Sequence, residues 1–200
     1  MSQLAAALAD LGALRAELQQ LRRERDALAA RVLELEQQVA SPSSVAPPPA
    51  AARFEESFRV EQSRAKRQRL ALSVALVELD GIQDLRDRLG HSAGEEALAH
   101  LARVLERALR PTDVVSAVDG LAFGLLLTAT SLEQALTAVT RLQQDFAQAP
   151  LDTGHGQEAL TFSAGLVQWR TDEALGDLLS RASRALGLAR RGGVARVVVG

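Results

Sequence analysis

The chain has 200 residues, of which 47% are hydrophobic and 24% charged, and its net charge at pH 7 is −2. This length predicts one ordinary domain with an extension, and the weak net charge argues against a general nucleic-acid or membrane-surface binder. Cysteine is absent, which excludes disulfides and thiolate metal sites, and no uninterrupted apolar run reaches the ~18 residues of a membrane span. We expect a cytoplasmic protein with neither nucleic acid nor membrane as a partner.

Residues 4–39 place apolar side chains at two positions of a seven-residue repeat, which predicts a coiled coil over residues 1–40. The first position holds Leu4, Leu11, Leu18, Arg25, Val32 and Val39, and the second holds Ala7, Leu14, Leu21, Leu28 and Leu35. In a parallel dimer the flanking charges pair with opposite signs, as Asp10 with Arg15, Glu17 with Arg22 and Arg31 with Glu36. We therefore predict a parallel homodimer through residues 4–39. A single amphipathic helix packed on the domain is the alternative that these charges disfavour.

Residues 41–52 form a Pro/Ser/Ala linker, because three consecutive prolines cannot continue a helix. Residues 53–200 alternate between helical and strand patterns. Helices are predicted at Phe54–Arg69, Ile82–Leu89, Ala93–Leu109, Leu132–Ala147 and Leu175–Arg191. Strands are predicted at Leu70–Leu79, Val114–Val118, Ala122–Ala129, Leu160–Gln168 and Val194–Val199. This order predicts an α/β fold of the α+β sandwich type, with a mixed sheet flanked by helices.

Asp119 and Gly120 separate two apolar runs, which is a strong local signal for a β-hairpin. From about residue 53 to the C-terminus, the order of several short motifs resembles the GGDEF domain of bacterial diguanylate cyclases. These motifs are Val77–Asp80, Leu89–Glu95, Arg110–Asp113, Asp119–Phe123, Phe162–Leu166 and Ala185–Arg190. The resemblance implies a nucleotidyl-cyclase-like sheet and a place in cyclic di-GMP signalling.

The family joins two GTP molecules with the help of Mg²⁺, and the resemblance implies that its signature lies at Asp119, Gly120, Leu121, Ala122 and Phe123 of this chain. The two acidic positions of the signature are occupied by Leu121 and Ala122, which supply no ligand and no base. We therefore expect a degenerate, catalytically inactive domain: not an enzyme, with no catalytic residue, no metal site and no cofactor.

Three further family positions depart from the pattern. Glu78 stands at the first metal position, and Arg86 and Glu95 stand at the positions that read guanine. Without a metal to bind, Glu78 and Asp80 are interpreted as solvated or helix-capping carboxylates.

Arg110-Pro111-Thr112-Asp113 stands five residues before the signature and resembles the Arg-x-x-Asp site at which many cyclases of this family bind their product. Arg141 falls at the offset of a second family arginine, so Arg110, Asp113 and Arg141 are the candidate ligand-binding residues. An arginine fork suits the O6 and N7 atoms of guanine, and a carboxylate accepts from its N–H groups. The structural alternative is that Arg110 complements a helix C-terminus and that Asp113 satisfies a turn.

Two functions follow from these observations, and residual diguanylate cyclase activity is a third that the substitutions in the signature disfavour. The first is a cyclic di-GMP receptor that acts through Arg110, Asp113 and Arg141. The second is a nucleotide-independent interaction scaffold, dimerised by the coiled coil, for a protein partner that the sequence does not identify.

Overall fold

The computed structural model describes residue 20 and residues 50–119, 121–154 and 156–200. The chain divides into two compact units, Met1–Pro47 and Pro48–Gly200, and the fold below is that of the second unit. The predicted coiled coil, its homodimer and residues 41–49 of the predicted linker lie outside the described residues. They stay predictions.

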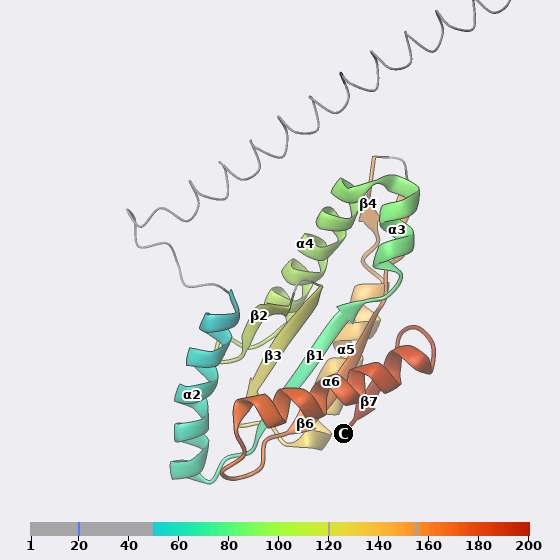
Figure 1. Ribbon diagram of the computed structural model, residues 1–200. Helices are drawn as coiled ribbons and strands as arrows, with labels where there is room; N and C mark the ends of the chain where they lie inside the picture. Colours follow the sequence, from blue (N-terminus) through green and yellow to red (C-terminus); the bar gives the residue numbers. More distant parts are fainter. Residues whose placement is uncertain (1–19, 21–49, 120, 155) are drawn as a thin grey trace, which may run out of the picture. The chain divides into compact units, whose positions relative to one another are not determined.

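The domain is built from long helices and a central sheet (Figure 1). The helices are α2 (Ala50–Gln68), α3 (Ile82–Leu89), α4 (His91–Ala108), α5 (Leu132–Ala147) and α6 (Leu175–Arg191). The strands are β1 (Leu72–Leu79), β2 (Val114–Asp119), β3 (Ala122–Thr128), β4 (Leu151–Asp152), β5 (Gln157–Glu158), β6 (Phe162–Gln168) and β7 (Val197–Val199). The predicted mixed α/β fold is confirmed.

Five strands form the main sheet in the order β2-β3-β1-β6-β7. The neighbours β2 and β3, β3 and β1, and β1 and β6 are antiparallel, whereas β6 and β7 are parallel. Leu72 of β1 pairs with Thr128 of β3, and Glu78 pairs with Ala122. We therefore distinguish the Leu72 end of the sheet, where β1 begins and β3 and β6 finish, from the Leu79 end, where β1 finishes and β3 and β6 begin.

Alternating side chains of β1 face two separate apolar cores, as expected for a strand buried on both faces. Ala75 and Val77 belong to the core under α4 and α5, which also contains Leu101 and Phe146. Their neighbours Val74 and Leu76 belong to the core under α2 and α6, which contains Phe54, Phe58, Leu178 and Leu186. Helices thus cover both faces of the sheet.

Three local differences from the sequence prediction have physical causes. Helix α2 begins at Ala50, so residues 50–52 are helical rather than part of the linker, as the high helix propensity of alanine allows. The pairing of β2 with β3 shifts register between Ala117 and Asp119, so β2 extends one residue further than predicted. The short pair β4–β5 was not predicted, because two residues in a strand are too few for a periodic pattern.

Candidate functional site

The candidate ligand residues meet at the Leu72 end of the sheet. Arg110, Asp113 and Arg141 line one cavity of about 170 Å³. Arg110 and Asp113 lie in the connection between α4 and β2, and Arg141 lies on α5. Within residues 50–119, 121–154 and 156–200, the guanidinium groups of both arginines make no hydrogen bond or ion pair with protein. The fold has therefore brought two unpaired cations from distant segments to one place.

Asp113 also has a clear structural task. Its carboxylate accepts a hydrogen bond from the Arg110 backbone N–H at 3.2 Å. The other carboxylate oxygen accepts from the backbone N–H of Thr128 at 3.0 Å and from the Thr128 hydroxyl at 3.3 Å. These bonds satisfy a turn and hold it against the end of β3, as the structural alternative anticipates. An ionised carboxylate has about four acceptor positions, so these contacts leave capacity for a ligand.

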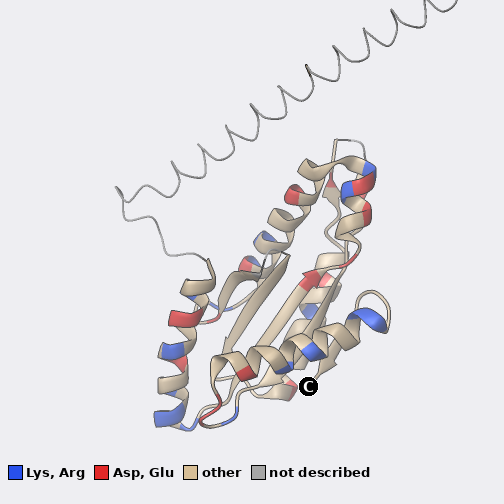
Figure 2. Cartoon of the chain, in the orientation of Figure 1, with Lys and Arg blue, Asp and Glu red and all other residues tan. Residues whose placement is uncertain are grey.

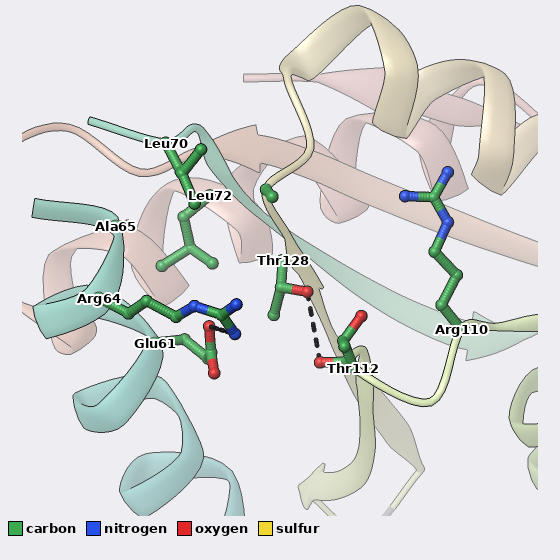
Figure 3. A pocket seen from close by; sticks show the side chains of 9 residues that line it. Glu61, Arg64, Ala65, Leu70, Leu72, Arg110, Thr112 and Thr128 are labelled. Atoms are coloured by element: carbon green, nitrogen blue, oxygen red, sulfur yellow. Dashed lines mark hydrogen bonds and ion pairs between the residues drawn. The ribbon is translucent and has the colours of Figure 1, made fainter. Parts of the chain in front are cut away.

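A neighbouring cavity of about 130 Å³ shares Arg110 with the first one and adds Arg64 of α2. Figure 3 shows Arg64 extending from α2 toward the loop that carries Thr112, with Arg110 on the far side of that loop. Arg64 Nη1 lies 3.7 Å from Glu61 Oε2, a loose ion pair that leaves the guanidinium half-exposed. Sequence reasoning missed Arg64. The one available signal is that Arg64 directly precedes the buried Ala65 and therefore flanks the packed face of α2.

The Leu79 end of the sheet is arranged differently, because its carboxylates are bound by the protein itself. Glu78 Oε2 lies 3.0 Å from Arg190 Nη1 of α6. Asp80 accepts hydrogen bonds from the Thr161 hydroxyl at 2.8 Å, from the Ser163 hydroxyl at 2.7 Å and from the Ala195 backbone N–H at 2.8 Å. The interpretation of Glu78 and Asp80 as solvated or helix-capping carboxylates is therefore wrong. Their partners come from α6, from the start of β6 and the residue before it, and from the α6–β7 connection, all distant in sequence from β1.

The signature region forms the turn between β2 and β3. Leu121 and Phe123 are partly buried and pack against the core under α4 and α5. Ala122 opens β3 opposite Glu78 of β1. Gly120 and the side chain of Asp119 lie outside the described structure. The residues at the two acidic family positions therefore contribute apolar surface here.

The residues at the guanine-reading positions are paired with each other. Arg86 Nη2 lies 2.7 Å from Glu95 Oε1, and the Arg86 stem packs over Gly94, where any Cβ would lie 2.5 Å from Arg86 Cγ. Arg86 Nε is buried with no hydrogen-bond partner. His91 Nε2 lies 3.5 Å from the same Glu95 oxygen. This ion pair joins α3 to α4.

The Mg²⁺ that the family resemblance implies was tested against the residues at the Leu79 end. Among the residues that the structure describes, no group of three or more His, Asp and Glu side chains converges. Glu78 faces a guanidinium, and both Asp80 oxygens are already occupied by hydrogen bonds. In this arrangement the residues do not fit a divalent metal.

A partly buried ion pair lies near the Leu72 end. Arg181 of α6 binds Glu173 at 2.7 Å, with exposed side-chain fractions of 13% and 10%. Partial burial opposes ionisation of Glu173, but hydrogen bonds from Arg181 and from the Arg170 backbone outweigh it and lower the pKa of Glu173 below its usual value. Arg181 also donates to the carbonyl of Gln168 at 2.6 Å, so this pair fastens the end of β6 to α6.

Comparison with known proteins gives these features a context. Residues 49–196 match the family described as diguanylate cyclase, GGDEF domain. Among curated proteins, the diguanylate cyclase DgcP of Pseudomonas aeruginosa is 34% identical over 145 residues. The match covers 72% of this chain but only 22% of that relative. Across the part of the chain that the structure describes, no helix combines the length and apolar character that a bilayer crossing requires.

Solved structures agree with this assignment. The diguanylate cyclase SiaD of Pseudomonas aeruginosa, solved with its activator SiaC, has a TM-score of 0.73 at 25% identity and covers 100% of this chain and 77% of its own. The active GGEEF domain of a diguanylate cyclase from Vibrio cholerae has a TM-score of 0.68 at 28% identity, covering 74% of this chain and 94% of its own.

These findings correct one prediction. The expectation that the chain is not an enzyme is contradicted, because its relatives are named diguanylate cyclases and a solved neighbour is described as active. The prediction rested on the side chains of Leu121 and Ala122. Two side chains are only part of a site, so their identity alone is too narrow a basis for that prediction.

Proposed function

The chain belongs to the GGDEF-domain family of diguanylate cyclases, and from that premise we propose that it binds cyclic di-GMP through Arg110, Asp113 and Arg141. The observation that carries the proposal is that these three residues, predicted from short motifs far apart in sequence, line one cavity. Both arginines lack a protein partner among the described residues, so their charge is available to a ligand.

The chemistry of the three groups matches the two parts of this ligand. A guanidinium reaches the O6 and N7 acceptors of guanine with two parallel hydrogen bonds, and the carboxylate of Asp113 accepts from guanine N–H groups. Arg141 lines the same cavity from α5, and its guanidinium, unpaired among the described residues, is available to a phosphate. Arg64 lines the adjoining cavity beside Arg110, so a ligand that extends past Arg110 meets a third cation.

Isothermal titration of the full chain with cyclic di-GMP tests the proposal, after bound nucleotide has been removed from the protein. We expect saturable heat for the wild type. Arg110→Ala and Arg141→Ala should each weaken binding by about tenfold or more, because charge-assisted hydrogen bonds contribute on the order of 1.5–3 kcal/mol. Arg107→Ala is the matched control, since Arg107 is an exposed arginine of the same helix end that does not line the cavity.

Asp113 needs a gentler substitution because it also holds the turn. Asp113→Asn keeps one acceptor oxygen for the Thr128 backbone while it removes the negative charge that guanine N–H groups prefer. Absence of heat for the wild type, or equal losses in Arg107→Ala and Arg110→Ala, would refute the proposal. The first of these results would instead favour the nucleotide-independent interaction scaffold.

A further inference from the structure

A third cavity, of about 520 Å³, lies where α2 ends and β1 begins. None of the residues proposed above to bind cyclic di-GMP lines it. Its polar lining consists of Lys66, Arg69, Gln168 and Thr171. We call it the α2 cavity. Figure 2 shows basic positions gathered at this end of α2. The volume falls within the range of about 300–1,000 Å³ that is typical of small-molecule sites.

Arg69 occupies a backbone conformation that its residue type does not favour. Its φ is 55°, and the Leu70 N–H donates to the Ala65 carbonyl at 3.0 Å, the pattern of a helix that ends with a left-handed residue. Glycine is the usual residue at this position, because side chains are strained there. Lys66 and Arg67 are explained by the negative end of the helix dipole, but this effect does not require an arginine at the strained position.

A second strained residue flanks the same cavity. Asp172 has a φ of 67°, and its carboxylate binds Lys66 Nζ at 2.5 Å. This ion pair bridges the end of α2 and the β6–α6 connection across two exposed side chains. Non-glycine residues with positive φ cluster at functional sites, where the surrounding structure maintains the strain. Two residues beside the α2 cavity, Arg69 and Asp172, therefore have energetically unfavourable backbone conformations.

Three hydrogen-bond donors of the cavity are unused. In residues 50–119, 121–154 and 156–200, the guanidinium of Arg69, the side-chain amide nitrogen of Gln168 and the hydroxyl of Thr171 have no protein partner. The amide oxygen of Gln168 is already engaged by the Leu132 backbone N–H at 2.9 Å, which fixes the orientation of its NH₂ group. The two carboxylates that follow Thr171 in the chain are both paired, Asp172 with Lys66 and Glu173 with Arg181. Within the described part of the chain, the cavity thus presents three unused donor groups and the unpaired positive charge of Arg69.

The remaining wall is apolar. It is formed by Ala65, Leu70 and Ala71 together with the indole of Trp169, whose Nε1 donates to the Glu173 carbonyl at 3.0 Å. A phosphate group alone does not fill a space of this size or use this wall. We propose that the α2 cavity binds a small phosphate monoester, with the phosphate on Arg69, Gln168 and Thr171 and the organic group against Leu70 and Trp169.

Trp169 supplies the readout, because it is the single tryptophan of the chain and lies in the cavity wall. The full chain is titrated with phenyl phosphate and with inorganic phosphate at constant ionic strength, followed by tryptophan emission and by calorimetry. We expect saturable binding of both anions, with phenyl phosphate binding several-fold more tightly because it also buries apolar surface.

The substitution Arg69→Gly distinguishes a loss of ligand affinity from a loss of stability. It removes the guanidinium and places the preferred residue at the helix end, so its thermal midpoint should be no lower than that of the wild type, while affinity for phenyl phosphate falls by about tenfold or more. Arg67→Gln, at a neighbouring basic position that does not line the cavity, should bind as the wild type does. Arg110→Ala should also leave phosphate binding unchanged, which distinguishes this site from the cyclic di-GMP site.

Three results would overturn the proposal. The first is absence of saturable binding by the wild type. The second is an equal loss in Arg67→Gln and Arg69→Gly, which would indicate diffuse electrostatic attraction only. The third is equal affinity for phenyl phosphate and inorganic phosphate, which would leave the apolar wall without a role.

Discussion

The two ends of the sheet differ in whether their charged residues have partners within the protein. At the Leu79 end, the carboxylates of Glu78 and Asp80 are bound by Arg190, by two hydroxyl groups and by a backbone N–H. At the Leu72 end, Arg110 and Arg141 face a cavity with no protein partner among the described residues. In this family the Leu79 end holds the signature turn, yet here the unsatisfied charge is at the opposite end.

This difference teaches that charged residues must be assessed by their partners before they are assigned a function. A charge that the protein itself satisfies stabilises the fold, whereas an unpaired charge in a cavity is available to a ligand. Three substitutions test this distinction, and their expected effects on stability decrease in the order given.

Asp80→Ala should cause the largest loss, about 3 kcal/mol in the free energy of unfolding, because it removes the acceptor of several hydrogen bonds. Urea denaturation followed by circular dichroism measures this loss. Asp84→Ala is the control, since its ion pair with Arg88 is exposed to solvent and its loss should change stability little. If the two variants were equally stable, Asp80 would not be structural and the contrast between the two ends would fail.

Glu173→Gln should cost about 2 kcal/mol at neutral pH, because it leaves the partly buried Arg181 without its partner. The lowered pKa of Glu173 sets the pH dependence. Its contribution is fully present above the unfolded value of about 4.3 and is lost as pH falls through the lower folded pKa. The stability difference between wild type and variant should therefore begin to shrink as pH falls below about 4.3 and should vanish only below the folded pKa of Glu173, as measured by denaturation at a series of pH values.

A stability difference that persisted unchanged into strong acid would show that the Glu173 carboxylate is not the source of the effect. This prediction sharpens the comparison of the two ends, because Glu173 and Arg181 are a satisfied pair at the same end of the sheet as Arg110 and Arg141, which are unpaired among the described residues.

Glu78→Gln should have the smallest effect, below about 1 kcal/mol, because its partner Arg190 is 59% exposed. Thermal denaturation measures the change, and cyclic di-GMP titration of the same variant should match the wild type. Arg190→Gln serves as the reciprocal variant. A change in ligand affinity in either variant would show that the two ends of the sheet are coupled.

Some parts of the fold were predictable and others were not. Helices α5 and α6 have the predicted bounds, because their apolar residues recur at helical spacing and their ends carry recognisable signals. The Ser131 capping box of α5 is one of these signals. The pair β4–β5 was missed, because a strand of two residues contains no period.

The candidate site divides in the same way. Arg110 and Asp113 are the first and last residues of a four-residue motif that is visible in the sequence. Arg141 was found through the family resemblance. Arg64 and Arg69 were missed, because only the packing of α2 beside β1 and β3 brings them to the Leu72 end. The apolar residues Leu121 and Ala122 were visible in the sequence, but the prediction drawn from these two side chains, that the chain is not an enzyme, is contradicted by its relatives.

The sequence alone determined the alternation of helices and strands, the family and the positions of the arginines, because these depend on spacing along the chain. Only the tertiary structure decided which charges are neutralised, because the partners of Asp80, Glu78 and Glu173 come from segments distant in sequence. A side chain's chemistry depends on the groups within hydrogen-bonding distance of it, and the folding of the sheet and helices sets those distances.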